Sequence, residues 1–108
     1  MNRKAKGSRR ERQTRDYFLK RGYDVIKAGA SLGKYDLVAM NEDRLLLIQC
    51  KSNKAPPWKE KVELMAHQNY PKKVTTKWLV IWVDHSRAGP EFYSITDEGF
   101  YLVEKPKF

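Results

Sequence analysis

Residues 33–51 read GKYDLVAMNEDRLLLIQCK, and this stretch decides the fold. Two apolar, strand-like runs flank the polar segment 41–44, which predicts an antiparallel hairpin. With Glu42 and Asp43 as a two-residue loop, paired residues have numbers that sum to 85. Glu-Asp lacks the Gly or Asn that tight two-residue turns favour, so this register is a hypothesis for the structure to test.

That register brings three polar side chains to one face of the sheet. Asp36 would lie opposite Gln49, and the Cβ atoms of directly opposed residues are about 5 Å apart. Lys51 follows Gln49 by two residues, so it would project from the same face. A carboxylate, an amide and an ammonium group placed together can hold a hard cation and a phosphate. A slip of the register by one residue would place Asp36 on the opposite face of the sheet from Gln49 and Lys51.

The composition describes one folded domain over residues 1–108. This length allows one core of five or six elements, and a hydrophobic content of 41% argues against a disordered chain. No apolar run reaches about 18 residues, so no membrane span is expected. The only cysteine, Cys50, cannot form an intramolecular disulfide, which fits a cytoplasmic location.

The formal net charge of +9 predicts attraction to a polyanion, with nucleic acid as the first candidate and a plain solubility charge as the alternative. Residues 1–7 are expected to form a basic, mobile arm. Ser8 should then begin a helix as the N-cap of a capping box with Glu11. Basic clusters contact backbone phosphates without reading sequence. The residues expected to contact DNA are Arg3, Lys4, Lys6, Arg9, Arg10, Arg12 and Lys34.

The rest of the chain completes an α/β pattern. The first helix should end before Gly22, with Thr14 and Phe18 on its inner face. Pro56-Pro57 should open a second helix that ends near Pro71, with Trp58, Val62 and Met65 facing inward. Strands are predicted near residues 23–27, 35–40, 44–51, 77–83, 91–95 and 100–103. The order is helix, three strands, helix, strand and a C-terminal hairpin. His85 lies in a predicted loop, where ordinary surface placement is favoured over a phosphate contact.

Four motifs follow one another in the first half of the chain: GSRRER at 7–12, AGAS at 28–31, DLVA at 36–39 and LIQCK at 47–51. In order and spacing this region resembles the PD-(D/E)xK nuclease superfamily. Within it, the closest resemblance is to the archaeal-type Holliday junction resolvases, including viral and phage members. The resemblance covers about half the chain and implies a restriction-endonuclease-like mixed β-sheet flanked by helices.

The resemblance also implies the site. The metal would be Mg²⁺, with Mn²⁺ as a substitute, and no small-molecule cofactor is expected. Lys51 would position the attacking water or the scissile phosphate. The implied catalytic residues are Glu11, Ser31, Asp36, Gln49 and Lys51, and the implied metal ligands are Glu11, Asp36, Gln49 and the main-chain carbonyl of Cys50.

Gln49 departs from the family pattern, which usually has Glu at this position. A neutral amide oxygen binds a hard cation less strongly than a carboxylate does. Some superfamily branches carry the acid on the following helix, where Glu60 and Glu63 are the candidates. Both are expected to lie opposite the inward stripe that contains Trp58, so Glu11 is the favoured second carboxylate.

These observations favour a metal-dependent endonuclease that acts on DNA as a homodimer. The resemblance implies that its substrate is a four-way junction, where two symmetric cuts need two sites. A nuclease acting on other branched or duplex DNA is one alternative. A non-catalytic DNA-binding relative that has lost productive metal binding is another, kept open by Gln49. A small RNA-binding protein would explain the charge, but not the placement of Glu11, Asp36 and Lys51.

Overall fold

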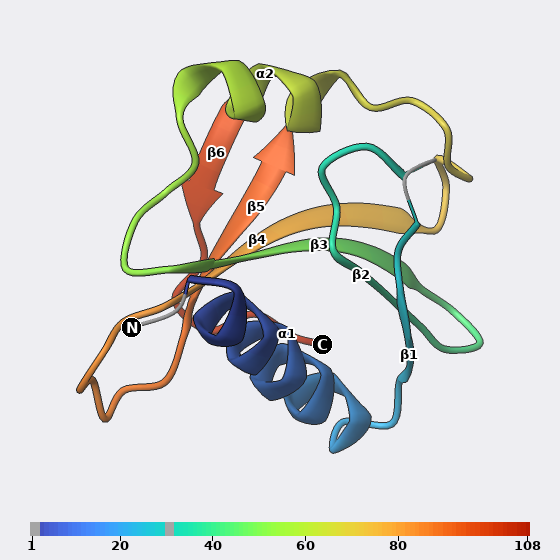
Figure 1. The fold of residues 1–108 in the computed structure, drawn as a ribbon. Helices are drawn as coiled ribbons and strands as arrows, with labels where there is room; N and C mark the ends of the chain where they lie inside the picture. The colour runs from blue at the N-terminus through green and yellow to red at the C-terminus, as the bar shows by residue number, and fades with distance from the viewer. Residues whose placement is uncertain (1–2, 30–31) are drawn as a thin grey trace.

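The computed structural model describes residues 3–29 and 32–108, with side chains described from Ser8 onward. In this part of the chain, six strands form one mixed sheet with a helix on either side (Figure 1). The predicted α/β class and element order are confirmed. The elements are α1 (Arg3–Leu19), β1 (Asp24–Lys27), β2 (Leu37–Met40), β3 (Leu45–Ser52), α2 (Trp58–Ala66), β4 (Thr75–Trp82), β5 (Glu91–Thr96) and β6 (Gly99–Leu102).

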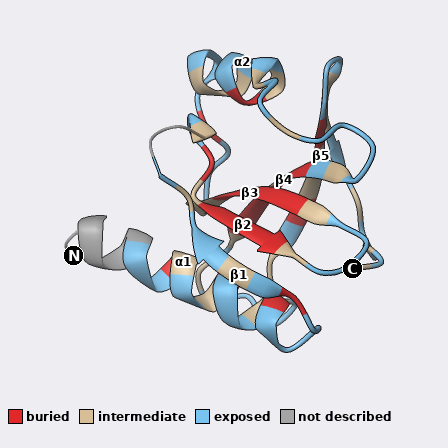
Figure 2. Cartoon of the chain, turned by 90° about the vertical axis from the view of Figure 1, so that its right-hand side faces the viewer, coloured by how far each residue is buried: buried red, intermediate tan, exposed pale blue. Residues whose placement is uncertain are grey.

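The strands cross the sheet in chain order, and β3 and β4 are the parallel pair among otherwise antiparallel neighbours. A parallel pair needs a crossover connection, which α2 provides. β3 is central and apolar on both faces: Ile48 packs with Phe18 of α1, and Leu47 packs in the cluster that contains Leu64 of α2. Buried positions accordingly concentrate on β2, β3 and β4 (Figure 2).

The hairpin between β2 and β3 has the predicted register. Leu37 pairs with Ile48, and Met40 pairs with Leu45. The Glu-Asp loop closes without glycine because the side-chain oxygen of Asn41 accepts hydrogen bonds from the main-chain N–H groups of Asp43 (2.9 Å) and Arg44 (2.8 Å). An Asn side chain that replaces a main-chain acceptor in this way is a known route to a tight turn.

The N-terminal helix is longer than predicted. It begins at Arg3, so Ser8 lies inside it and the expected capping box with Glu11 is wrong. Residues 3–7 continue the helix and are not a separate arm. Alternating Lys and Ala favour this extension, and one interior glycine costs only about 1 kcal/mol relative to alanine.

The second helix is shorter and rotated relative to the prediction. It ends at Ala66, because His67 has extended backbone angles. Trp58 is 71% exposed and Val62 is 41% exposed, so the prediction that these two residues face inward is wrong. Met65 packs partly against the core as predicted, and Leu64 is the residue fully buried against the sheet. The Tyr35 hydroxyl donates to the main-chain carbonyl of Leu64 (2.8 Å) and fixes this orientation. The rotation turns Glu60 toward the sheet.

Candidate active site

Asp36 is held at the ends of β2 and β3. It directly precedes β2, and its main-chain N–H donates to the carbonyl of Ile48 (2.8 Å). Its carboxylate oxygen Oδ2 accepts a hydrogen bond from the main-chain N–H of Cys50 (2.8 Å). The carboxylate is thereby fixed beside the residue that lies between Gln49 and Lys51, which is the neighbourhood that the sequence pattern predicts.

The half-buried carboxyl group of Asp36 has a raised pKa, about 6. Burial is the main cause, because it penalises the charged form. The Cys50 N–H lowers the pKa, Glu11 raises it, Lys51 lowers it and Glu60 raises it. Three carboxyl groups therefore influence one another at this point. A bound cation would relieve their repulsion and keep Asp36 ionised.

Gln49 is buried, with 2% of its surface exposed. Its amide nitrogen Nε2 donates to the Lys34 carbonyl (3.2 Å) and to the Glu60 carboxylate (2.5 Å). Its amide oxygen Oε1 is buried and accepts no hydrogen bond from the described residues. A buried acceptor without a partner is costly, and an amide oxygen is a suitable ligand for a hard cation. The orientation of Gln49 therefore leaves one oxygen free to bind a metal.

Glu60 on α2 is the site residue that sequence reasoning missed. Besides Gln49, its carboxylate contacts the ammonium nitrogen of Lys51 (3.2 Å), and the Glu60 side chain is only 18% exposed. The expectation that Glu60 faces away from the site is wrong, because α2 is rotated to bury Leu64. Glu63 does face outward and forms a long surface ion pair with Lys34 (3.8 Å). The spacing of Glu60 and Leu64, one helical turn apart, was the available signal.

Glu11 approaches the same region from α1. Its side chain is 28% exposed, and its carboxylate lies 3.7 Å from the Lys27 ammonium. It is close enough to Asp36 to raise the pKa of that carboxyl. Because α1 begins at Arg3, helix capping does not account for Glu11.

Cys50 points to the opposite face of β3. Its side chain packs against the cluster of buried residues around Phe18. Burial raises the pKa of the thiol to about 12, with a hydrogen bond from Thr14 acting in the opposite direction. The sulfur is therefore a protonated, apolar neighbour of the core, and only the main chain of Cys50 faces the site.

The oxygen atoms of this site can hold a hard cation only if carboxylates and neutral oxygen donors act together. Among the described residues, no three His, Cys, Asp or Glu side chains converge closely enough to hold a metal by themselves. A cation beside Asp36 would therefore draw on the Gln49 amide oxygen or the Cys50 carbonyl in addition to carboxylates. Oxygen donors of this kind suit Mg²⁺ and similar ions.

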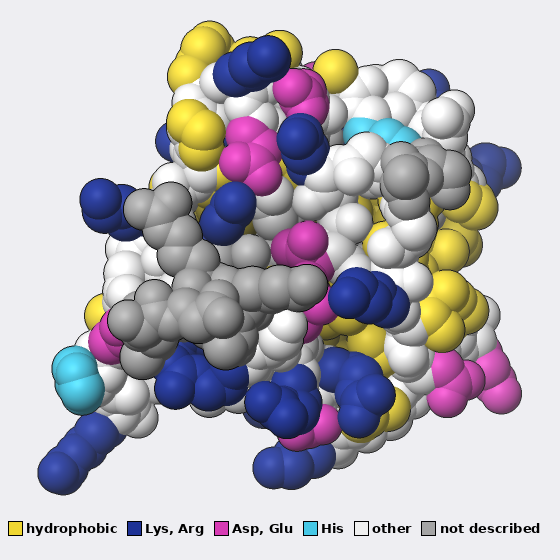
Figure 3. Space-filling model, viewed as in Figure 1, with side chains coloured by type: hydrophobic (Ala, Val, Ile, Leu, Met, Phe, Trp, Pro, Cys, Tyr) yellow, Lys and Arg dark blue, Asp and Glu magenta, His cyan; other side chains and the backbone are white. Residues whose placement is uncertain are grey.

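The basic residues separate into two groups. Arg9 and Arg12 are exposed on α1, and Lys and Arg side chains gather over this helix in the lower half of Figure 3. Arg10 is buried: it donates to Ser52 (3.1 Å) and Gln13 (2.9 Å) and pairs with Asp84. Its guanidinium is occupied within the fold, which argues against the predicted contact of Arg10 with DNA. The side chains of Arg3, Lys4 and Lys6, and all of Ser31, lie outside the described residues.

The fold and the site together define a nuclease of the PD-(D/E)xK type: a mixed sheet with Asp36 at the hairpin entrance and Lys51 two residues beyond Gln49. The family model for the archaeal Holliday junction resolvase (Hjc) matches residues 2–98, so the chain belongs to that family. It is a Holliday junction resolvase, an endodeoxyribonuclease that binds DNA junctions and, like its family, requires a divalent metal. The resemblance predicted from residues 7–54 is confirmed.

A solved structure supports the fold. The Hjc resolvase of the archaeal hyperthermophile Archaeoglobus fulgidus has a TM-score of 0.61 and 18% sequence identity, with 91% of this chain and 83% of that one covered. No curated protein matches the sequence. Within residues 3–29 and 32–108, neither helix has the length and apolar character needed to span a bilayer.

Proposed function

We propose that this resolvase cleaves junction strands with Mg²⁺ held by Asp36, Gln49 and Glu60, with Glu11 as a further direct or water-mediated ligand. The observation that carries this proposal is the buried, unpartnered amide oxygen of Gln49. The amide nitrogen of the same side chain contacts the Glu60 carboxylate, and the Asp36 carboxylate is held at the main chain of the next residue, Cys50. Glu60 restores the negative charge that Gln49 lacks. We propose the main-chain carbonyl of Cys50 as a further metal ligand and the hydroxyl of Ser31 as a contact to the phosphate.

The side chains divide the work by charge. When bound, the metal lowers the pKa of a coordinated water and neutralises charge that develops on the phosphate. Lys51 holds its ammonium group at the carboxylate of Glu60 (3.2 Å), where it can orient the attacking water or stabilise the phosphate. Gln49 fixes the Glu60 carboxylate through its amide nitrogen. Exposed Arg9, Arg12 and Lys34 would contact the duplex backbone.

The first experiment measures cleavage of a labelled four-way junction with Mg²⁺ or Mn²⁺. Asp36→Ala should abolish cleavage while junction binding persists, because Asp36 acts on the metal rather than on the DNA backbone. Full cleavage by Asp36→Ala would remove Asp36 from the metal site. Binding of the junction by wild-type protein with no cleavage in either metal would instead favour the non-catalytic alternative.

The second experiment tests the role of Glu60 by Mn²⁺ titration calorimetry. Glu60→Gln should weaken metal binding at least about tenfold, whereas Glu63→Gln, on the outer face of the same helix, should leave it unchanged. The double variant Gln49→Glu/Glu60→Gln moves the carboxylate from the helix to the strand and should restore binding. Equal affinities for wild type, Glu60→Gln and Glu63→Gln would exclude Glu60 as a ligand.

We also propose that the protein acts as a homodimer in the cytoplasm. Two symmetric cuts across a junction need two sites, which a two-fold dimer supplies. The apolar outer side of α2, where Trp58 is 71% exposed, is consistent with a protein that is not monomeric. Analytical ultracentrifugation should give twice the chain mass at micromolar concentration, and a monomer that still makes paired cuts would contradict this proposal.

A further inference from the structure

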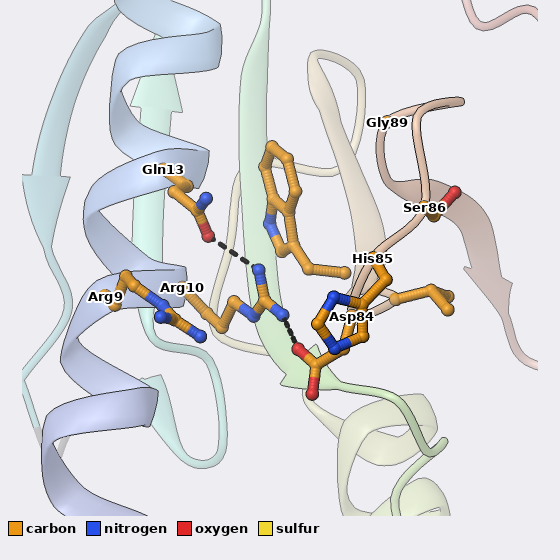
Figure 4. A pocket seen from close by; sticks show the side chains of 9 residues that line it. Arg9, Arg10, Gln13, Asp84, His85, Ser86 and Gly89 are labelled. Atoms are coloured by element: carbon orange, nitrogen blue, oxygen red, sulfur yellow. Dashed lines mark hydrogen bonds and ion pairs between the residues drawn. The ribbon is translucent and has the colours of Figure 1, made fainter.

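A polar pocket lies between α1 and the loop that follows β4 (Figure 4). Its cavity volume is about 460 Å³. Arg9, Arg10 and Gln13 line it from α1, and Asp84, His85 and Ser86 line it from the loop after β4. None of these residues takes part in holding the metal in the proposed mechanism.

A hydrogen-bond network fixes the pocket wall to the catalytic strand. Arg10 donates to the hydroxyl of Ser52, the residue directly after Lys51. The side chain of Asn53 donates to Asp84 (2.9 Å), and the main-chain N–H of Asp84 donates back to Asn53 (2.8 Å). Both α1 and the loop after β4 are therefore tied to the end of β3.

Cationic and hydrogen-bonding side chains in the pocket are available to bind an anion. The Asp84 carboxylate is neutralised by Arg10 and contacted by Asn53. Arg9 and His85 are exposed, and neither has a hydrogen-bond or ion-pair partner among the described residues. In Figure 4, Arg9 and Arg10 extend from the helix toward the loop that carries His85.

The backbone at His85 supports a binding role for this loop. His85 has φ +64°, in the left-handed region that residues other than glycine seldom adopt. Such conformations cost of order 1–3 kcal/mol and concentrate at binding and catalytic sites. His85 lies at the surface, as the sequence predicted, and its side chain lines the pocket.

We infer that this pocket binds a backbone phosphate of the DNA junction other than the scissile one. The inference rests on the proposed function, because the scissile phosphate is placed at Lys51. Lys51 and Ser52 project to opposite faces of β3, so the pocket lies around the end of this strand from Lys51. Each strand of B-form DNA carries a phosphate about every 3.4 Å along the axis, so a duplex that reaches Lys51 presents further phosphates to the residues around it. The guanidinium of Arg9, the imidazole of His85 and the hydroxyl of Ser86 supply the donors that phosphate oxygens accept.

The test measures binding of a labelled four-way junction in EDTA, where cleavage cannot occur, across a series of salt concentrations. Arg9→Gln should weaken binding roughly fivefold to tenfold and reduce the slope of log K against log salt by about 0.9. Lys73→Gln is the matched control, because it removes the same charge from an exposed position before the opposite end of β4. Equal effects of the two variants would overturn the pocket assignment.

A second variant tests the loop. His85→Asn keeps a residue that tolerates the left-handed conformation but shortens the reach into the pocket, and it should weaken junction binding about threefold. Wild-type affinity for His85→Asn would exclude the loop from the phosphate site. Circular dichroism of each variant should match that of wild type, so the affinity loss cannot be assigned to unfolding.

Inorganic phosphate separates the possible sources of the ligand. Titration with phosphate should shift the His85 ring resonances in NMR spectra of wild type and not of Arg9→Gln. If this shift occurs while both variants bind the junction like wild type, the pocket takes free phosphate and the DNA assignment is wrong. Failure of the metal mechanism would appear separately, as cleavage that survives Asp36→Ala, and would not alter these binding results.

Discussion

The two helices are attached to the sheet by different physical means. On one face, Phe18 of α1 is fully buried, and its ring centroid lies 4.8 Å from that of Phe108 and 5.6 Å from that of Tyr23. On the other face, Leu64 is the buried residue of α2. Hydrogen bonds to the last turn of α2 add to this small apolar contact, including those from the Lys77 ammonium group to the carbonyls of Leu64 (3.3 Å) and Met65 (2.9 Å).

This difference separates stability from function. α1 is held to the sheet by apolar burial, so weakening its contact with the sheet would mainly lower the stability of the hydrophobic core. α2 is a short, lightly buried helix that carries Glu60 into the site. Polar groups fix its rotation and its position along the sheet, because hydrogen bonds are directional and apolar contact is not.

The largest expected effect comes from breaking the α1 contact. Phe18→Ala should lower the free energy of unfolding by about 3–5 kcal/mol, because it leaves a cavity beside the rings of Tyr23 and Phe108 in addition to the lost apolar burial. Urea denaturation followed by circular dichroism measures this change. A loss below about 1 kcal/mol would mean that the aromatic cluster is not the main anchor of α1.

Leu64→Ala should lower the free energy of unfolding by less, about 2–3 kcal/mol. It should, however, affect metal binding at the site more than Phe18→Ala does. Because the burial of Leu64 holds α2 against the sheet, where the hydrogen bonds from Tyr35 and Lys77 fix its rotation, the variant should weaken Mn²⁺ binding. Phe18→Ala, measured under conditions where it stays folded, should not. Calorimetric titration of both variants provides the comparison. Equal metal affinities in the two variants would show that Glu60 is not positioned through the burial of Leu64.

The same difference explains what could be predicted from the sequence. The β2–β3 hairpin was predictable, because both of its strands are apolar and the two-residue side-chain period allows one favourable register. The buried face of α1 was also predictable, since Thr14 and Phe18 recur at helical spacing within a long helix. These elements are positioned by the burial of apolar side chains, which a periodic pattern reports directly.

The orientation of α2 could not be predicted in this way. Its largest apolar side chain, Trp58, is exposed, and the helix instead buries Leu64 and turns Glu60 inward. The groups that select this rotation, Tyr35 and Lys77, are distant in sequence. The commitment of Arg10 to Asp84 was hidden for the same reason: a basic run reveals charge, but not which member has a long-range partner.

The carboxyl group of Asp36 gives an intermediate effect that depends on pH. Its pKa is about 6 in the folded protein, against an ordinary value of 3.8. The folded state therefore binds the proton more readily, so stability falls as pH rises from about 4 to about 6. Asp36→Asn removes this penalty and should stabilise metal-free protein at pH 8 by about 1–2 kcal/mol.

The gain should disappear below about pH 4, where Asp36 is protonated in both the folded and the unfolded states. Denaturation in EDTA between pH 4 and pH 8 measures the difference in stability between Asp36→Asn and wild type. Addition of Mn²⁺ at pH 8 should make wild type the more stable of the two. A gain from Asp36→Asn that is independent of pH would contradict the assignment of the penalty to an ionised carboxylate.

The smallest effect is expected at the outer side of α2. Trp58→Ser should change the free energy of unfolding of the protomer by less than about 0.5 kcal/mol, because an exposed side chain loses little on substitution. Urea denaturation tests this at a protein concentration where analytical ultracentrifugation gives the monomer mass. The same measurement at high protein concentration adds a second comparison. If the destabilisation by Trp58→Ser grows with protein concentration, a second copy of the chain covers this face. Association with that copy would then hold α2 in place in addition to the hydrogen bonds to its last turn.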